Sequence, residues 1–298
     1  MDLNFSEAMW VRLLLWRHLK IRYSALMLTL VVCSCLPDPL DVDGIPVVKP
    51  QIVVSTQIIP DQSLIVLLTK TFGALDASDE SDPETLLKQI AIVDAVVTIE
   101  GPEGIYELES LDNGLYGGLI IPFEEGRDYT LHVVSPSLGE VSATTTVKRL
   151  VSFDDIKAEL IFNGYDDTLA QITYRLKDTA EKNWYMLNVQ QIQRSDLLDN
   201  LLNPRAFTRL VDDHDFNGEE FQETFRVFPR DFIPGDTIAI SLSNISKDYY
   251  DFIDLRLENR FSFVEYLSEP VNYPSNVNGG KGFFNLYIPD VKTFVLEY

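Results

Sequence analysis

Short β-rich runs separated by turn signals constrain most strongly how this chain can fold. Alternation of apolar and polar side chains is typical of half-buried strands, and clusters of glycine, proline and aspartate mark the turns between them. After a predicted opening hairpin (residues 51–59 and 63–71), five further runs follow one another. They are residues 95–100, 105–108, 115–121, 129–135 and 141–147. This spacing predicts an immunoglobulin-like β-sandwich over residues 51–150.

A second β-rich domain is expected over residues 151–298. Its predicted strands are residues 157–162, 169–176, 184–193, 221–228, 237–244, 283–287 and 293–296. Ser246 is a candidate N-cap for one helix. Apolar side chains follow it at helical spacing: Tyr249, Phe252, Ile253 and Leu257. The expected fold is therefore mostly β, with an N-terminal immunoglobulin-like sandwich and a second β-rich domain that carries one or two short helices.

The beginning of the chain has the layout of a secretory signal. A basic region from Arg17 to Arg22 precedes an apolar run over residues 23–34. The run of about 12 residues is shorter than the ~20 that an uncleaved membrane-spanning helix needs. The basic flank and the prolines that follow Cys35 also disfavour a buried core helix. We therefore expect a signal peptide over residues 1–34 and a tether over residues 35–50.

The four residues at the end of this run resemble a bacterial lipobox, in which the last cysteine is lipidated and becomes the first mature residue. They are Val32, Cys33, Ser34 and Cys35. Signal peptidases of this class need a small side chain before the modified cysteine. Ser34 meets that requirement for Cys35, whereas Val32 does not meet it for Cys33. Cys35 is thus the predicted lipidation site.

Charge and cysteine content exclude several classes of function. The chain has a formal net charge of −22. Removal of residues 1–34, which contain four basic and two acidic side chains, leaves about −24. Such a surface repels nucleic acids and anionic lipid headgroups. Both cysteines lie at or before Cys35, so the mature body has no thiol for disulfides, catalysis or metal binding.

Four motifs occur in an order that spans nearly the whole mature chain. They are DVD at residues 41–43 with PQIVV at 50–54, VDAVVTI at 93–99 with GLY at 114–116, GDTI at 235–238 with SKDYYD at 246–251, and PSNVNGGKGFF at 274–284. In this order they resemble the Bacteroidetes outer-membrane lipoproteins of domain-of-unknown-function family 4249 (DUF4249). The acidic stretch at residues 76–84 and the long N-terminus depart from that pattern.

The resemblance implies an outer-membrane lipoprotein that carries diacylglycerol and an N-acyl chain on Cys35. Two or more acyl chains give stable anchoring, whereas one is marginal. Similar proteins are often encoded beside TonB-dependent receptors. The implied role is therefore a non-enzymatic accessory to an outer-membrane β-barrel receptor in nutrient uptake. The resemblance implies no catalytic residue and no cofactor.

One stretch resembles a metal site. Asp213, Asp215 and Asn217, with Gly218, match the first half of a calcium loop, in which alternating side-chain oxygens suit a hard cation. The twelfth position is Thr224 instead of a bidentate glutamate. The alternative is a polar turn that precedes a strand. The mature histidines, His132 and His214, have no plausible serine partner nearby in the sequence.

Two other functions remain open. A surface glycan-binding or adhesion module would expose aromatic side chains on one sheet face. The candidates are Tyr249, Tyr250, Tyr266, Tyr273 and Tyr287. A carboxylate-based hydrolase would need two acids about 5 to 9.5 Å apart in a cleft, a pairing that leaves no spacing in the sequence. The three functions differ in surface shape: a protein-binding patch, an aromatic platform or an acidic cleft.

Overall fold

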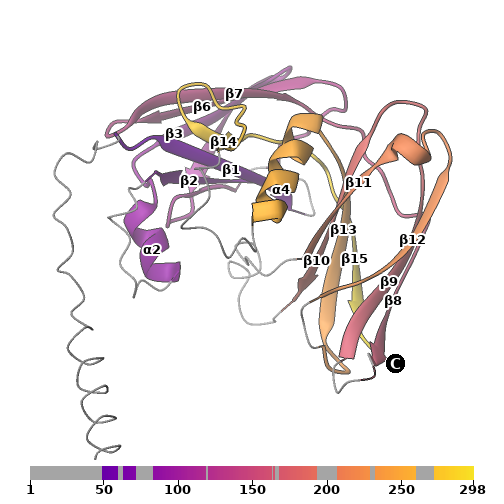
Figure 1. Ribbon diagram of the computed structural model, residues 1–298. Helices are drawn as coiled ribbons and strands as arrows, with labels where there is room; N and C mark the ends of the chain where they lie inside the picture. Colours follow the sequence, from indigo (N-terminus) through magenta and orange to yellow (C-terminus); the bar gives the residue numbers. More distant parts are fainter. Residues whose placement is uncertain are drawn as a thin grey trace, which may run out of the picture. The chain divides into compact units, whose positions relative to one another are not determined.

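The computed structural model describes residues 49–59, 63–71, 83–118, 120–162, 164, 168–192, 207–228, 232–259 and 272–298. The chain from Val48 onward forms one compact unit. Most regular structure in these ranges is β, and the two α-helices are α2 (Pro83–Ile90) and α4 (Lys247–Asn259) (Figure 1). The predicted fold class is confirmed: the structure is mostly β, arranged in several sheets, with short helices. None of the helices described is long and apolar enough to cross a bilayer.

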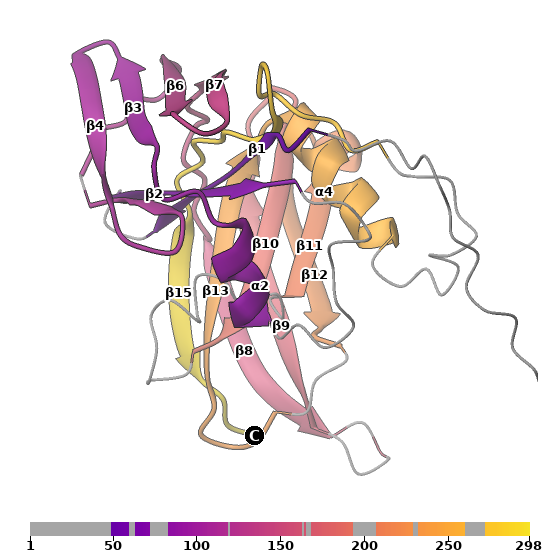
Figure 2. The ribbon, with the colours of Figure 1, turned by 90° about the vertical axis from the view of Figure 1, so that its left-hand side faces the viewer.

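The first part of the structure is one eight-stranded sheet, which we call the N-terminal sheet. Its strands are β1 (Ile52–Ile59), β2 (Ser63–Lys70), β3 (Val96–Gly101), β4 (Gly104–Ser110), β5 (Leu115–Gly117), β6 (Asp128–Ser135), β7 (Gly139–Thr146) and β14 (Lys281–Phe283). They lie in the order β14-β1-β2-β5-β4-β3-β6-β7. Alternate residues are buried along β2 and β6, as expected for strands with one face on a core. The helix α2 contacts β2 (Figure 2).

A segment from the end of the chain completes this sheet. β14 pairs in parallel with β1, with Val54 opposite Gly282. Gly282 has φ +95°, and a Cβ there would lie 1.9 Å from the carbonyl oxygen of Val54, so only glycine fits. Ser142 of β7 also forms a bridge with Asn278, which connects the far edge of the sheet to the segment before β14.

The predicted domain boundary at residue 150 stays a prediction. Three apolar side chains from beyond that boundary, Val277, Phe284 and Leu286, pack in the core of the N-terminal sheet. The last part of the chain therefore contributes to both halves of the structure.

The second part has two sheets around one core, and we call it the C-terminal sandwich. Its strands are β8 (Asp155–Phe162), β9 (Thr168–Lys177), β10 (Trp184–Gln191), β11 (Phe207–Asp212), β12 (Glu220–Arg226), β13 (Thr237–Ile245) and β15 (Asp290–Val295). One sheet has the order β11-β10-β13-β15 and the other β12-β9-β8. Glu223 of β12 joins them, because it accepts hydrogen bonds from Tyr174 of β9 (3.0 Å) and from Nε of Arg209 of β11 (2.9 Å).

The helix α4 follows β13 and has the predicted N-cap, since the backbone N–H of Tyr249 donates to Ser246 Oγ at 3.2 Å. One face of α4 meets the segment around β14 through aromatic rings. The ring centroids of Phe252 and Phe283 lie 4.8 Å apart, and those of Tyr249 and Tyr287 lie 5.9 Å apart. An aromatic cluster thus fixes α4 against the strand that completes the N-terminal sheet.

Candidate functional site

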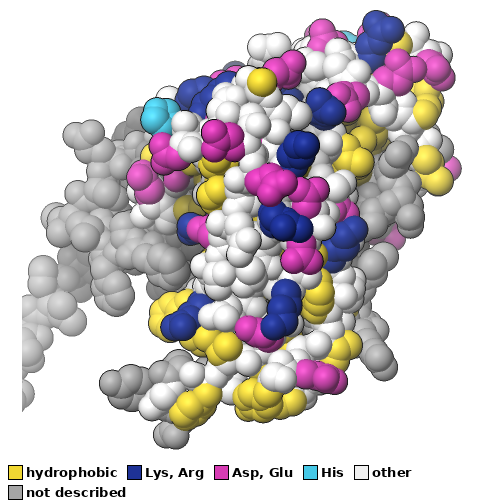
Figure 3. Space-filling view, turned by 90° about the vertical axis from the view of Figure 1, so that its right-hand side faces the viewer, with side chains coloured by type: hydrophobic (Ala, Val, Ile, Leu, Met, Phe, Trp, Pro, Cys, Tyr) yellow, Lys and Arg dark blue, Asp and Glu magenta, His cyan; other side chains and the backbone are white. Residues whose placement is uncertain are grey.

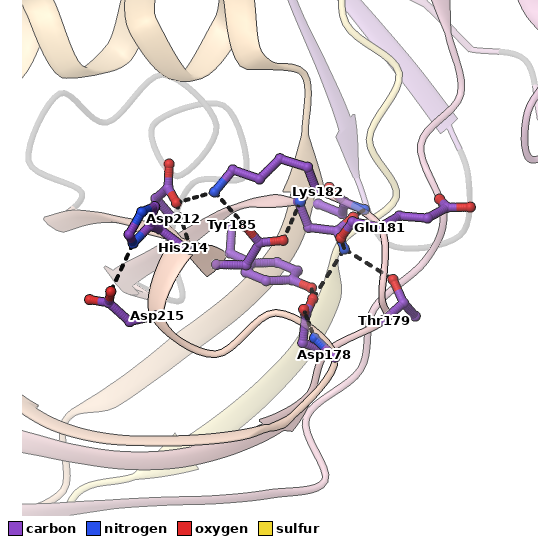
Figure 4. A network of polar contacts seen from close by, with 12 residues as sticks. Asp178, Thr179, Glu181, Lys182, Tyr185, Asp212, His214 and Asp215 are labelled. Carbon is purple, nitrogen blue, oxygen red and sulfur yellow. Dashed lines mark hydrogen bonds and ion pairs between the residues drawn. The ribbon is translucent and has the colours of Figure 1, made fainter.

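The clearest concentration of polar side chains lies where two loops of the C-terminal sandwich meet (Figure 4). One loop joins β9 to β10, and the other follows β11 and contains the 3-10 helix η1 (Asp213–Asp215). Asp212 begins η1, because its carboxylate accepts the backbone N–H of His214 at 2.7 Å. Trp184 at the start of β10 lies opposite Asp212 at the end of β11, so the strand pairing brings the two loops together.

Asp178 is a buried acceptor at the centre of these loops. Its side chain accepts hydrogen bonds from the backbone N–H of Gly218 (2.8 Å), from Asn183 Nδ2 (3.1 Å) and from the hydroxyl of Tyr185. Burial raises the pKa of Tyr185, and the hydrogen bond to the carboxylate raises it further. The hydroxyl therefore keeps its proton and stays a donor to Asp178.

Asn183 connects this centre to its surroundings. Its Nδ2 also lies within hydrogen-bond distance of Thr179 Oγ1 (3.0 Å) and the carbonyl oxygen of Glu181 (2.7 Å). Its Oδ1 accepts from Asn244 Nδ2 at 2.9 Å, at the end of β13. Its backbone N–H donates to Asp213 Oδ2. The buried side chain of Asn183 thus holds the β9–β10 loop in shape. Its hydrogen bonds are effective because they are electrostatically stronger inside a protein than in water.

Lys182 compensates two acids in the second loop. Its Nζ pairs with Asp212 and lies 2.6 Å from Oδ1 of Asp213, whose side chain is fully buried. The hydrogen bonds to Asp212, and then to Asp213, raise the pKa of Lys182. The same Nζ lies 5.6 Å from the ring centroid of Trp184. A buried carboxylate is tolerated only with such a partner, because removing a lone charge from water is costly.

We call this group the polar clamp, and its members are Asp178, Lys182, Asn183, Tyr185, Asp212 and Asp213. Each of its three acids already accepts a hydrogen bond from another residue of the chain or forms an ion pair with one. The clamp ties two loops together. Each buried acid in it already has a partner within the chain, so none of these acids is free to act on a substrate.

The three residues of the predicted calcium loop do not converge. Asp213 is buried and paired with Lys182. Asp215 points outward, 93% exposed, and its carboxylate meets His214 Nδ1 at 2.8 Å. Asn217 is exposed as well. In the ranges that the structure describes, no group of three or more His, Cys, Asp or Glu side chains could hold a metal ion. The arrangement matches the alternative, a polar turn before β12.

The tyrosines considered for a glycan platform lie mostly inside the molecule. Tyr287 is 8% exposed, and Tyr249 stacks on it with burial raising the pKa of both hydroxyls. Tyr250 is half-buried against the same cluster, and Tyr273 lies at its rim, 36% exposed. Tyr266 lies outside the described residues. The aromatic side chains that can be placed therefore form a packing cluster more than a platform.

Cys35, the predicted lipidation site, lies outside the described residues. His132 is on β6 with Nε2 3.5 Å from a carboxylate oxygen of Glu100, and both side chains are exposed. In the sheet, His132 is opposite Thr98 of β3 and Ser142 of β7.

Sequence reasoning missed Asp178, Lys182 and Asn183. Nothing in their local pattern marks them, since they lie in an ordinary polar loop. Their importance comes from partners about 30 residues away, such as the bond between Asn183 and Asp213. Only knowledge that β10 pairs with β11 would have indicated the role of these three residues.

A second feature lies at the other end of the same strands. Ile233 precedes β13, whereas Asn244, which donates to Asn183 of the clamp, lies near the other end of that strand. Five apolar side chains are exposed there: Phe162 (61%), Phe228 (69%), Ile233 (64%), Val295 (58%) and Tyr298 (78%). We call these five the apolar end. In the space-filling view, hydrophobic side chains gather at the lower end of the sandwich, where Figure 1 places the C-terminus (Figure 3).

Backbone hydrogen bonds bring the segments of the apolar end together. Phe232 donates its N–H to the carbonyl oxygen of Thr168 (3.1 Å), the residue paired with Phe162. Gly235 donates to Leu296 (2.9 Å). The end of β8, the loop before β13 and the end of β15 are thus neighbours by hydrogen bonding.

Comparison with known proteins places the chain in one family. None of the characterised proteins compared with it matches. Among solved structures, it is similar to the two-domain fibronectin type-III segment from chicken tenascin, with 11% sequence identity. That similarity covers 66% of this chain and 91% of the tenascin segment, at a TM-score of 0.20, which is no guide to fold or function. The model of the domain of unknown function DUF4249 matches residues 38–293. The chain therefore belongs to the DUF4249 family.

Proposed function

We propose that the protein is a lipid-anchored, non-enzymatic accessory protein of the outer membrane that works with a TonB-dependent receptor in nutrient uptake. The lipobox-like residues that end at Cys35 support the anchor, and the large negative charge supports attachment by lipid instead of by a basic face. The similarity to lipoproteins encoded beside such receptors supports the partner.

One observation favours this function over a carboxylate-based hydrolase: the acids of the polar clamp are already in use. A glycosidase needs one acid free to protonate the leaving group and another free to act as base or nucleophile. Asp178 instead accepts three hydrogen bonds, and Asp213 accepts a backbone N–H and pairs with Lys182. Those bonds hold the carboxylates as structural acceptors.

The outer face of the β12-β9-β8 sheet favours a binding protein without an aromatic platform. Its strands carry polar cross-strand pairs, such as Thr173 with Thr224 at 2.9 Å. Lys157 and Glu159 of β8 form an ion pair at 2.5 Å. Figure 3 shows basic and acidic side chains alternating along this face. Carbohydrate platforms rely on exposed aromatic rings, which this face does not present among its described residues.

The experiment that tests the function is purification of the native protein from detergent-solubilised outer membranes, followed by mass spectrometry. We expect an N-terminal peptide that begins at acylated Cys35 and a stoichiometric β-barrel receptor. The matched control is Cys35→Ser, which should lose acylation and leave the membrane fraction, while Cys33→Ser should keep both. Recovery of the acylated protein alone would contradict the accessory role, and an unmodified Cys35 would contradict the anchor.

A further inference from the structure

We infer that a small hollow at the start of α4 binds one small anion, of the size of a halide ion or a short carboxylate. We call it the junction pocket. Its walls come from three distant segments: the end of β7 with the residues after it, the end of β13 with the N-cap of α4, and the segment after β14. All three belong to the compact unit that begins at Val48. An anion bound there would connect the N-terminal sheet to the C-terminal sandwich, whatever role the protein has at the membrane.

The buried side chain of Asn285 is the observation that points to a ligand. Asn285 lines the pocket and is 5% exposed, yet its Nδ2 has no hydrogen-bond partner. Leaving a buried donor unpaired is costly, and native proteins pair nearly all such groups with the chain itself, with water or with a ligand. The chain supplies no partner here, so the partner must come from the pocket.

Contacts of the neighbouring residues show which way the Asn285 side chain points. Phe284 and Leu286 pack in the core of the N-terminal sheet, whereas Phe283 and Tyr287 contact the ring of Tyr249 on α4. Side chains thus alternate along this segment, as they do in extended chain. The Asn285 side chain therefore lies on the same side as Phe283 and Tyr287, toward the start of α4.

Ser246 and Lys148 add two more donors to the wall of the pocket. Ser246 Oγ already accepts the N–H of Tyr249 at 3.2 Å, so its hydroxyl proton is left to donate elsewhere. Lys148 is half-buried and forms no ion pair or hydrogen bond with any residue that the structure describes. An unpaired lysine is unexpected in a chain with 46 acidic and 24 basic side chains. A negatively charged ligand would supply the partner that it lacks.

The composition of the pocket selects an anion, and its size selects a small one. None of its lining side chains is acidic, and Asp248 in the first turn of α4 is exposed outside it. The positive end of the 13-residue helix α4 favours negative charge as well. The hollow has a volume of about 170 Å³, including the part open to solvent, whereas pockets for drug-sized molecules begin at roughly 300 Å³. A nucleotide or a sugar is therefore too large.

Melting temperatures of the full chain in three sodium salts test the site. The salts are bromide, acetate and the bulky sulfonate MES, each at about 0.3 M so that charge screening is equal. We expect the gap between wild type and Lys148→Met to be wider in bromide or in acetate than in MES, by about 3 °C or more. Comparing variants within one salt removes the general effect of that salt on stability. Widening in bromide alone identifies a halide site, and widening in acetate identifies a carboxylate site.

The matched control is Lys177→Gln, on the exposed end of β9, whose gap from wild type should be the same in all three salts. A gap for Lys148→Met that is equal in all three salts would overturn the inference.

Asn285→Leu separates a bound anion from a pocket without a ligand. Leucine has a similar size and needs no hydrogen bond, so without a ligand the variant should be as stable as wild type or more stable. With an anion bound, the variant should melt below wild type in the salt that widens the Lys148→Met gap, and should not do so in MES. A variant that matches or exceeds wild type in every salt would overturn the inference.

Crystals grown in bromide or acetate give a direct readout. We expect electron density for the anion within hydrogen-bond distance of Lys148 and Asn285, with an anomalous signal where it is bromide. A single ordered water at that place in both salts would overturn the inference.

Discussion

The side-chain amide of Asn276 pairs with the backbone of Phe284 as a neighbouring strand would. Asn276 Nδ2 donates to the carbonyl oxygen of Phe284 at 2.8 Å, and the N–H of Phe284 donates to Asn276 Oδ1 at 2.9 Å. Ser275 Oγ adds a bond to the carbonyl oxygen of Gly282 at 2.8 Å. The PSNVNGGKGFF motif at residues 274–284 therefore has a structural role: it shapes the segment that enters the N-terminal sheet.

Replacing Asn276 with alanine should destabilise the protein by about 2–4 kcal/mol. Both polar groups of the buried Phe284 backbone would lose their partner, and each unsatisfied buried group costs about 1–3 kcal/mol. The free energy of unfolding from urea titration measures the effect. The control Asn272→Ala, at an exposed position, should stay within about 0.5 kcal/mol of wild type.

Gly282→Ala should cost more than Gly235→Ala, although both glycines have φ +95°. The backbone conformation alone costs about 1–2 kcal/mol for an L-residue. At Gly235 a Cβ would meet nothing within 4 Å, whereas at Gly282 it would collide with the carbonyl oxygen of Val54. We expect Gly282→Ala to fail to fold or to lose more than about 3 kcal/mol. Equal melting temperatures for the two variants would refute the close approach of β14 to β1.

Asn183→Asp should destabilise the polar clamp strongly, by about 3 kcal/mol or more. A second carboxylate would then face Asp178, and Asp178 would lose the hydrogen bond that the Asn183 amide donates. The control Asn188→Asp should cost far less, because Asn188 acts as an acceptor for Thr208 Oγ1 at 2.8 Å, and aspartate can do the same. Protonation removes the repulsion, so the deficit of Asn183→Asp should shrink at acidic pH. A deficit that grows on acidification would contradict this picture.

The stability that Lys182 contributes should depend on pH at both extremes. Hydrogen bonds to Asp212 and Asp213 raise the pKa of Lys182, so its contribution is fully present below the ordinary lysine value and is lost as pH rises through the raised one. Burial of Asp212 opposes ionisation, but Lys182 and the N–H of His214 outweigh it and lower the pKa of Asp212. That contribution is present above the ordinary aspartate value and is lost as pH falls through the lowered one.

We therefore expect the stability difference between wild type and Lys182→Gln to be constant between about pH 4 and pH 10 and to shrink outside that range. Urea midpoints at pH 3, 5, 7, 9 and 11 measure it. Lys177→Gln, on the exposed end of β9, provides the control and should show little difference at any pH. A difference that is largest at pH 3 would contradict the ion pairs of the clamp.

Calcium should not stabilise the protein. Lys182 already occupies Oδ1 of Asp213, and Asp215 points into solvent. Adding millimolar Ca²⁺, or removing it with EDTA, should leave the melting temperature unchanged. A binding ligand would raise it with concentration, and such a rise would restore the calcium interpretation of residues 213–217.

The sequence predicts the local parts of this fold well and the long-range parts poorly. Alternation identifies strands such as β2 and β6, and Ser246 marks the start of α4, because those signals lie within a few residues. Residues 283–287 were expected to close the C-terminal half, yet β14 ends at Phe283 and pairs with β1. A parallel pairing between distant segments leaves no local period, and the polar clamp shares this difficulty.

Completion of the N-terminal sheet depends on β14, a segment that is made long after the other strands of that sheet. The bond from the backbone of Asn285 to Thr56 Oγ1 joins positions 229 residues apart. Strand pairing at such separation is slow, because the chain loses the conformational entropy of loop closure before any stabilising contact forms. Until residue 283 is available, the edge of β1 lies open as a template for pairing with other chains. Nascent or truncated chains that stop short of residue 281 should therefore be the aggregation-prone form of this protein.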